Sequence, residues 1–510
     1  MQSKGKVESG KVESKRHVRS ALTAAGLIVF ASALILAQSA EQDATARVIG
    51  LILGPSSIDE NLRQLTDEIG GRYPGTEPNR KAVAWALDAF KRAGVDDVHV
   101  ETVKIPASWQ EGPTRLEVIA KSPFTARAVS IAWTPGIPGG SIEAPVLDLG
   151  EGTEEEFSRS GAAVRGSLIL IHSKVLRTWA DLFAEYGDAP PVIERSIKAG
   201  AAAILWTATR EHGILYRHTN TFDGRIDRIP QVLVAREDAL KLSRFIATGT
   251  KVRARLALAN RVAGPIDADN VIGEIRGADK ADEIVMIGAH LDSWELGTGA
   301  LDNGCNAALV LEVARAVRAA GIRPRRTLRF ALWNGEEQGM LGSWAYARSH
   351  RDELDRVVAY VNFDGGIGHV TGYSLGGRKD IEAGVRDLMK PVQAWDMNAH
   401  TVDATNGTDH LDFMLEGVPT LNANQDEGNY LPNYHATSDT LDKVDMRELK
   451  LHTAYAAVTM LGIANRAERL GRRLSRPEIE QTIRDTDFEP QMRLFGQWQG
   501  WTEGTRGRQK

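Results

Sequence analysis

Residues 284–290 read Ile284-Val-Met-Ile-Gly-Ala-His290, an apolar run that ends in a histidine. A short continuous apolar run of this kind predicts a strand that is buried on both faces of a sheet. Three more strands of this type are predicted at 327–333, 357–363 and 418–422. Helices are predicted between them at 304–320, 340–350 and 380–390. The alternation predicts an α/β fold, a doubly wound and mostly parallel sheet with helices on both faces.

The chain on either side of this core divides into further segments. Residues 41–134 contain two amphipathic helices and an alternating strand, and we assign them to the first part of the same domain, whose second part is 263–465. Residues 135–262 have several short strands and no cluster of histidines with carboxylates, which predicts a smaller β-rich domain inserted between the two parts. The tail at 466–510 is charged and then tryptophan-rich, and it stays unassigned.

The amino terminus has the order of an export signal. Basic residues from Lys4 to Arg19 precede an uncharged apolar run at 21–37, and small residues follow it as far as Ala40. This order favours a cleaved signal peptide within 1–40, with a retained N-terminal anchor as the alternative. The protein is therefore expected to be exported, either periplasmic or secreted, or tethered to a membrane by residues 21–37.

Composition excludes some classes of protein. A net charge of −5 over 510 residues, with no basic stripe after the first twenty, argues against nucleic acid as a partner. The one cysteine, Cys305, excludes an intramolecular disulfide. Cys305 opens an alanine-rich helix, which favours a packing role over a nucleophilic one. The sequence leaves the oligomeric state open, and a homodimer is one of the options.

The residues that carry chemistry follow the predicted strands. They are His290, Asp292, Asp302, Glu336, Glu337, Asp364 and His435. Open α/β sheets place ligands at the carboxyl ends of their strands, because the loops there converge above the sheet edge. We therefore expect these side chains to lie in one site.

Imidazole and carboxylate ligands without a thiolate suit zinc, cobalt or manganese. Five or more protein groups are too many for one catalytic zinc, and they suit two metals that share a carboxylate and a water. The adjacent Glu336 and Glu337 would then divide the work, one binding metal and the other acting as a base. Each residue taken alone also has an ordinary structural explanation, such as a helix cap or a buried core histidine.

Several motifs resemble the co-catalytic zinc aminopeptidase family of clan MH, and within it the carboxypeptidase Q-like members. They are His290-Leu-Asp-Ser-Trp294, Gly299-Ala-Leu-Asp-Asn-Gly304, Trp333-Asn-Gly-Glu-Glu-Gln-Gly339, Asn362-Phe-Asp364 and Tyr434-His-Ala-Thr-Ser-Asp-Thr440. The inserted segment at 135–262 resembles a protease-associated domain more weakly. Asp302-Asn303 replaces the Asp-Asp common in the family, and Cys305 stands where glycine is frequent, but neither change removes a ligand.

The resemblance implies a set of metal ligands. His290 and Asp364 would hold one Zn²⁺, Glu337 and His435 would hold the other, and Asp302 would bridge them. Co²⁺ or Mn²⁺ are expected substitutes.

The resemblance also implies catalytic roles. Glu336 would be the general base for the shared water, and Asp292 would orient the imidazole of His290. Tyr434 could donate to the oxyanion, while Asp409 and His410 remain candidates in a substrate loop. The implied activity is a metallo-exopeptidase, an aminopeptidase or dipeptidase acting on short peptides with a free N-terminus.

Hypotheses from other functional classes stay open at this point. Gly372-Tyr-Ser-Leu-Gly376 matches a nucleophile elbow, so a serine hydrolase would use Ser374 with His435 and either Asp409 or Asp412. A glutaminyl-cyclase-like acyl transferase would bind one zinc on the same fold. A dinucleotide enzyme is disfavoured because Gly297-Thr-Gly299 lacks the third glycine. A non-catalytic relative would have lost ligands, and none is missing.

Overall fold

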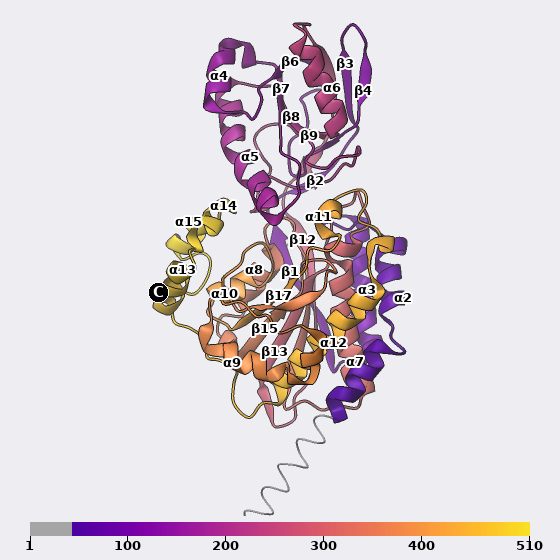
Figure 1. Cartoon of the computed structure of the whole chain (residues 1–510), viewed down its shortest axis with the longest axis vertical. Helices are drawn as coiled ribbons and strands as arrows, with labels where there is room; N and C mark the ends of the chain where they lie inside the picture. The colour runs from indigo at the N-terminus through magenta and orange to yellow at the C-terminus, as the bar shows by residue number, and fades with distance from the viewer. Residues whose placement is uncertain (1–42, 510) are drawn as a thin grey trace, which may run out of the picture.

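Two large sheets organise residues 43–509, the part of the chain that this computed structural model describes (Figure 1). One sheet has seven strands and contains the predicted core, and the other has eight strands and lies above it in Figure 1. A short two-stranded ribbon, β2 (Ser108–Gln110) with β11 (Arg261–Ala263), connects the segments at which the chain leaves and re-enters the first domain. The predicted signal or anchor at 1–40 lies outside the described residues.

The seven-stranded sheet is mixed. Its strands, in spatial order, are β1 (Asp97–Ile105), β12 (Ile266–Ile275), β14 (Arg326–Trp333), β13 (Lys280–His290), β15 (Val357–Asn362), β17 (Thr420–Gln425) and β16 (Val370–Ser374). The four strands from β14 to β17 are parallel, as predicted, whereas β1, β12 and β16 add by antiparallel pairing. The α/β prediction is confirmed, but the expectation of a mostly parallel sheet holds for the centre alone.

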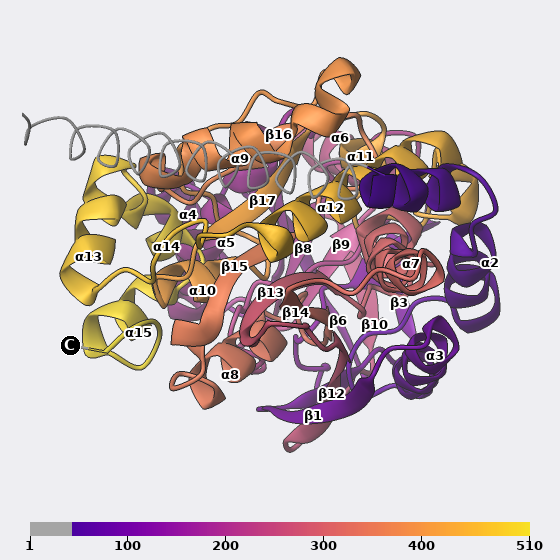
Figure 2. The same ribbon diagram turned by 90° about the horizontal axis from the view of Figure 1, so that it is seen from below.

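Helices cover both faces of this sheet (Figure 2). On one face lie α2 (Ile58–Arg63), α3 (Glu77–Ala93), α7 (Cys305–Ala319) and α12 (Met446–Asn465), and on the other lie α8 (Leu341–Ser349) and α10 (Leu411–Leu415). The first face forms a large aliphatic core, and the second packs aromatic residues such as Trp333, Tyr360 and Phe413. Both faces of the parallel strands are therefore buried, which explains their continuous apolar sequences.

Local signals set the helix ends. Thr76 accepts a hydrogen bond from the backbone N–H of Asn79 at the start of α3, and Gly94 ends the helix in the left-handed conformation. The first of the two amphipathic helices expected in 41–134 is divided into α2 and a π-helical turn, Gln64–Ile69, and Ser57 before α2 makes no side-chain hydrogen bond to the helix.

The eight-stranded sheet has the order β4-β3-β10-β6-β7-β8-β9-β5. Its strands are β3 (Thr114–Ile119), β4 (Phe124–Ala126), β5 (Ala128–Ser130), β6 (Ser141–Asp148), β7 (Leu168–Ile171), β8 (Ala203–Thr207), β9 (Gln231–Val234) and β10 (Arg253–Leu258). Helices α4 (Glu154–Ser160), α5 (Trp179–Ala199) and α6 (Arg236–Ala247) pack against it. The sheet uses β3 to β5, so it draws on chain before residue 135, where the predicted insert starts. We call residues 114–258 the inserted domain.

The C-terminal segment, residues 476–509, folds against the first domain. It contains α13 (Arg476–Asp485), α14 (Glu489–Leu494) and α15 (Gln497–Glu503), and Trp501 is buried in it. Figure 1 shows these helices (yellow) beside the seven-stranded sheet, with α14 towards the lower end of α5. None of the helices in residues 43–509 is both long and apolar enough to cross a bilayer.

Candidate active site

The parallel strands bring the predicted residues together. His290 is the last residue of β13, Asp364 follows β15, and Glu336 and Glu337 follow β14. His435 follows α11 (Tyr430–Asn433), which is reached from the end of β17. Neighbouring parallel strands end at the same sheet edge, so these groups converge there.

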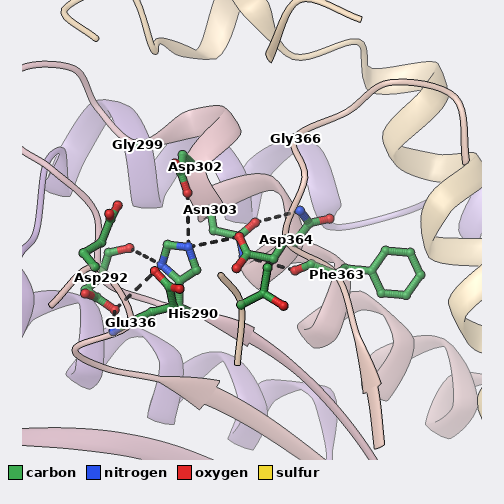
Figure 3. Close-up of polar contacts among 12 residues, drawn as sticks. His290, Asp292, Gly299, Asp302, Asn303, Glu336, Phe363, Asp364 and Gly366 are labelled. Atoms are coloured by element: carbon green, nitrogen blue, oxygen red, sulfur yellow. Dashed lines mark hydrogen bonds and ion pairs between the residues drawn. The ribbon is translucent and has the colours of Figure 1, made fainter. Parts of the chain in front are cut away.

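Three of the side chains form one cluster of possible metal ligands (Figure 3). The Nε2 atom of His290 lies 3.1 Å from Oδ1 of Asp302 and 3.2 Å from Oδ1 of Asp364. All three side chains are almost completely inaccessible to solvent. This arrangement offers one nitrogen and two carboxylate oxygens to a single ion.

A second cluster shares Asp302 with the first. The Nε2 atom of His435 lies 3.2 Å from Oδ2 of Asp302 and 2.9 Å from Oε2 of Glu337. The two oxygens of Asp302 therefore face different histidines, one in each cluster. A carboxylate in this position can bridge two cations.

Burial and charge together perturb the pKa values of these groups. Burial lowers the pKa of His435, but Glu337 and Asp302 outweigh burial and raise it to about 9. Burial raises the pKa of Glu337 to about 7 and that of Asp364 to about 6, against the opposing effect of the nearby histidines. For Asp302, hydrogen bonds from His290 and His435 outweigh burial and lower the pKa. So many acids in a buried site favour a bound cation.

Glu336 differs from its neighbour Glu337. It lines the cavity, and within the described chain no hydrogen bond reaches its carboxylate. Burial, opposed by His290 but reinforced by Asp364 and other acids, raises the pKa of Glu336 well above its ordinary value. A free carboxyl group with a raised pKa has the properties of a general base or acid.

Asp292 lies at the site but contacts it differently from the prediction. The backbone carbonyl of Asp292 accepts from Nδ1 of His290 at 2.8 Å, while its carboxylate Oδ1 is 3.7 Å from that nitrogen. The carboxylate instead accepts from the backbone N–H of Glu336 at 3.3 Å. The residue therefore orients His290 through its main chain and holds the Glu336 loop through its side chain.

Tyr434 lies beside the second cluster and lines the cavity. Its ring stacks on His435, with centroids 3.6 Å apart, and its hydroxyl is 3.0 Å from the hydroxyl of Tyr186 on α5. Burial raises the pKa of Tyr434 well above its ordinary value, so the phenol stays protonated. The inserted domain thereby positions a hydroxyl donor next to the second cluster.

The residues that a serine or cysteine hydrolase would use make other contacts. Ser374 ends the edge strand β16, and its Oγ donates to the carbonyl of Asp403 at 3.0 Å, outside the cavity. Asp412 forms a buried ion pair with Arg506. Cys305 is buried, its thiol contacts the carbonyl of Leu301, and burial raises its pKa. The structure assembles no serine or cysteine triad from these residues.

The two candidates in the substrate loop have different surroundings. His410 is buried and contacts Thr408 and the carbonyl of Thr405, which indicates a role in holding the loop. Asp409 is buried, and burial together with Asp364 raises its pKa against the opposing effect of His290. Asp409 therefore interacts electrostatically with the first cluster, whereas the contacts of His410 are within its own loop.

Asp439 was not singled out from the sequence, although it lies in the quoted motif that follows His435. Its carboxylate accepts backbone N–H groups from Ala300, Leu301 and Asp302 at 3.1, 2.6 and 3.2 Å. It thus joins the loop of Asp302 to the loop of His435. A carboxylate four residues after a ligand is the only sequence signal for this role.

Arg72 is a second residue that the sequence did not reveal. Its fully buried guanidinium donates to the carbonyl oxygens of Leu291, Gly70, Thr298 and Gly299. Three of these contacts, those with Leu291, Thr298 and Gly299, hold the loop between His290 and Asp302 in place.

A cavity of about 470 Å³ opens above the two clusters. Its floor carries Asp302, Glu336, Glu337, Asp364 and His435. One wall is apolar and comes from the inserted domain and the C-terminal segment. A second, mostly polar part of the lining comes from residues 401–408 and 422–425.

With this geometry established, comparison with known proteins identifies the family. The sequence model described as "Peptidase family M28" matches residues 270–460. The chain contains a peptidase family M28 domain. The matched range includes all the residues of both clusters, so this chain is a metallopeptidase.

Relatives of the M28 domain extend the match over most of the chain. Carboxypeptidase Q from Mus musculus is 28% identical over 416 residues, covering 81% of this chain and 87% of the relative. A probable lipoprotein aminopeptidase, LpqL, from Mycobacterium tuberculosis is 26% identical over 430 residues, covering 76% and 80%.

Solved structures agree on the fold. A peptidase M28 precursor from Shewanella amazonensis matches with a TM-score of 0.77 at 26% identity, covering 86% of this chain and 99% of that one. BSAP, a zinc aminopeptidase from Bacillus subtilis, matches with a TM-score of 0.64 at 19% identity, covering 82% and 97%, which shows the fold alone. The predicted α/β fold is thus the fold of M28 structures.

Proposed function

We propose that this M28 peptidase is an aminopeptidase that removes the N-terminal residue of short peptides with the help of two zinc ions. The observation that carries the proposal is the pair of ligand clusters that share Asp302 on the floor of the cavity. His290 and Asp364 would hold one ion, and Glu337 and His435 the other. The similarity to carboxypeptidase Q and to a zinc aminopeptidase supports zinc and an exopeptidase.

The residues fit the two ions. The donor set contains nitrogen and carboxylate oxygen without sulfur, which suits zinc and admits cobalt or manganese. The Oε1 atom of Glu337 is buried and has no hydrogen-bond partner in the described chain, as expected for an atom that serves a ligand. When bound, two zinc ions lower the pKa of a water and polarise the scissile carbonyl.

The chain's own groups supply proton transfer and orientation. Glu336 takes a proton from the attacking water and returns it to the leaving amine, so it acts as base and then as acid. The carboxylate of Asp292 fixes the backbone of Glu336 for this transfer. Tyr434, held by Tyr186, donates its hydroxyl proton in a hydrogen bond to the oxygen that becomes negative.

The charge of the cavity favours recognition of the amino end of a substrate. Five of its lining residues are carboxylic acids, namely Asp302, Glu336, Glu337, Asp364 and Asp403. No lysine or arginine of the described chain lines it. Asp302, Glu337 and Asp364 would be taken up by the ions, which leaves Glu336 and Asp403 as the lining acids that hold no metal. A free C-terminal carboxylate would find no cationic side chain here, whereas an amino group would find these two acids. We therefore favour an aminopeptidase over a carboxypeptidase or a strict dipeptidase.

The enclosure of the cavity limits substrate length. A volume of about 470 Å³ is within the usual range for small-ligand sites and has room for a few residues. The inserted domain covers the site from one side through Trp179, Phe183 and Phe222. Short peptides and chain ends can enter such a space more readily than a folded protein.

Export is part of the proposal and rests on the basic, apolar and small-residue order at 1–40. The lipoprotein label of one relative is consistent with it. Cell fractionation of the full chain, with activity in the exported fraction expected, tests it. Activity in the cytoplasmic fraction alone would contradict it.

The central test replaces Glu336 by Gln. We expect Glu336→Gln to bind the same amount of zinc as the wild type and to lose at least ~10²-fold in kcat, because a general base contributes about that much. Glu154→Gln on the exposed surface of α4 is the matched control, and its activity should be unchanged. Full activity of Glu336→Gln with zinc present would refute the role of Glu336.

A substrate panel separates the proposal from its alternatives. Free peptides, N-blocked peptides and peptides amidated at the C-terminus are compared with and without chelator. Cleavage of free and amidated peptides, lost with chelator, supports the aminopeptidase. Cleavage of N-blocked substrates alone would contradict it. Covalent capture by a fluorophosphonate would indicate a serine hydrolase through Ser374, and one zinc per chain would favour the glutaminyl-cyclase-like transferase.

A further inference from the structure

The apolar wall of the cavity is built by parts of the chain outside the matched family range. Phe183 and Tyr186 come from α5, and Phe222 comes from a loop of the inserted domain. Phe495 directly follows α14 in the C-terminal segment. All four lie outside residues 270–460, so the family match says nothing of this wall.

Phe495 is the centre of this aromatic wall. Its ring centroid lies 5.2 Å from that of Phe222, 6.0 Å from Phe183 and 5.8 Å from Tyr186. The contacts with Phe222 and Phe183 are edge-to-face, a favourable geometry for aromatic pairs. Phe183 and Phe222 keep part of their surface exposed, whereas Phe495 is 6% exposed, and all three line the cavity.

The wall is close to the metal ligands. Phe495 contacts Tyr186, the hydroxyl of Tyr186 meets that of Tyr434, and the ring of Tyr434 stacks on His435. Two intervening side chains therefore separate Phe495 from a ligand of the second cluster.

The loops that carry the wall are fixed. A Cβ atom on Gly339, three residues after Glu336, would lie 2.1 Å from the carbonyl oxygen of Phe222, so the two loops are in direct contact. Gln497, two residues after Phe495, accepts a hydrogen bond of 2.7 Å from Asn406 in the polar part of the lining. The C-terminal segment thus joins both walls of the cavity.

We propose that this aromatic wall is the subsite for a large apolar side chain next to the scissile bond, and that Phe495 sets its size. The inference rests on the proposed peptidase function and names the substrate class, namely short peptides with leucine, methionine or phenylalanine at one flanking position. Burying such a side chain is worth about 10- to 100-fold in kcat/KM over alanine. Charged side chains are excluded from this position because the wall offers no polar partner.

The test uses two tripeptide series, Xaa-Ala-Ala and Ala-Xaa-Ala, with Ala, Leu, Phe or Asp at Xaa. The wild type should prefer Leu or Phe over Ala by about 10- to 100-fold at one of the two positions. In Phe495→Ala that ratio should fall about tenfold, while Phe495→Leu should keep most of it. Phe495→Trp should shift the preference from Phe towards Leu, because the larger ring fills the space.

Matched controls separate this effect from general destabilisation. Phe245→Ala removes a partly buried ring that packs on Phe124 in the inserted domain, away from the cavity, and should leave the ratio unchanged. Trp498→Ala perturbs the C-terminal segment without touching the wall and should do the same. Each variant is checked by thermal unfolding.

Two outcomes would overturn the subsite. These are equal kcat/KM for Ala, Leu and Phe at both positions of the wild type, and an unchanged ratio in folded Phe495→Ala. Failure to cleave any tripeptide overturns the peptidase proposal and the subsite with it, whereas cleavage with a flat ratio overturns the subsite alone.

Discussion

Glu336 and Glu337 are adjacent in sequence, yet the structure separates their chemistry. Glu337 contacts His435 at 2.9 Å and belongs to a ligand cluster. Glu336 lines the cavity, and its carboxylate has no hydrogen-bond partner in residues 43–509. Adjacent residues after a strand point in different directions, so one can serve a metal while the other remains free for proton transfer.

The ligands depend on backbone contacts that no motif shows. Asp302 is held by the carboxylate of Asp439, which accepts three consecutive N–H groups of its loop. Burial raises the pKa of Asp439 to about 7, a shift that these N–H groups oppose. Asp439 is therefore a positioning residue that acts through Asp302.

We predict that Asp439→Asn weakens zinc binding while the protein stays folded. The amide has one acceptor oxygen instead of two, so at least one N–H of the loop loses its partner. Loss of an outer contact to a ligand typically costs 10- to 100-fold in metal affinity. Competition with a chelating dye measures the affinity, and excess zinc should restore most of the activity.

Asp442→Asn is the control, because Asp442 is exposed and three residues further along the chain. Wild-type zinc affinity in Asp439→Asn would show that the loop of Asp302 keeps its conformation without the carboxylate of Asp439.

At the scale of elements, the sequence predicts the strands and helices that bury apolar faces. It does not predict the features that depend on contacts between residues far apart in the chain. Strands 284–290 and 327–333 have continuous apolar runs because both of their faces are covered, and the predicted ranges match β13 and β14 closely. The ligand positions could be predicted because parallel strands end at one edge. The hydrogen bond of His290 to the main chain of Asp292, rather than to its side chain, depends on loop geometry that has no sequence pattern.

The inserted domain and the C-terminal segment were harder to delimit. Strands β4 and β5 have three residues each, too short for an alternating pattern. Helices α14 and α15 have six and seven residues, and Phe495 between them contacts partners far away in sequence, namely Phe183 and Phe222. The aromatic wall therefore could not be predicted.

One buried ion pair holds the C-terminal segment to the first domain. Arg506 donates to both oxygens of Asp412 on α10 at 2.8 and 2.7 Å, and both side chains are at most 6% exposed. The guanidinium also lies 4.9 Å from the ring centre of Trp344. Removing one member of such a pair leaves a buried charge without a partner.

We predict that Asp412→Asn lowers the free energy of unfolding by about 3–5 kcal/mol, as is typical when a buried pair is broken. The double change Asp412→Leu with Arg506→Met should cost much less, because it removes both charges. Urea unfolding of the full chain measures both.

Glu489→Gln breaks an exposed pair with Arg493 on α14 and should cost less than about 1 kcal/mol. An equally small loss in the free energy of unfolding for Asp412→Asn would mean that water reaches the Asp412–Arg506 pair in solution.

At the scale of the whole molecule, the active site lies where three parts of the chain meet. The seven-stranded sheet supplies the acids and histidines, the inserted domain supplies Tyr186, and the C-terminal segment supplies Phe495. The backbone N–H of Arg217 in the inserted domain also donates to the carbonyl of His435 at 2.9 Å. Metal binding should therefore stabilise the contact between the domains as well as the floor of the cavity.

We predict that chelation of the metals lowers the Tm by about 3–8 °C and that added zinc restores it. A ligand present at 100 times its Kd stabilises the folded state by about 2.7 kcal/mol, and removing it also leaves several buried acids without a cation. Glu336→Gln should show the full shift because Glu336 is not a ligand, whereas Glu337→Gln should show a reduced one. Scanning calorimetry with and without chelator gives both values. An equal shift in the two variants, or none in the wild type, would place the stabilising metal outside this site.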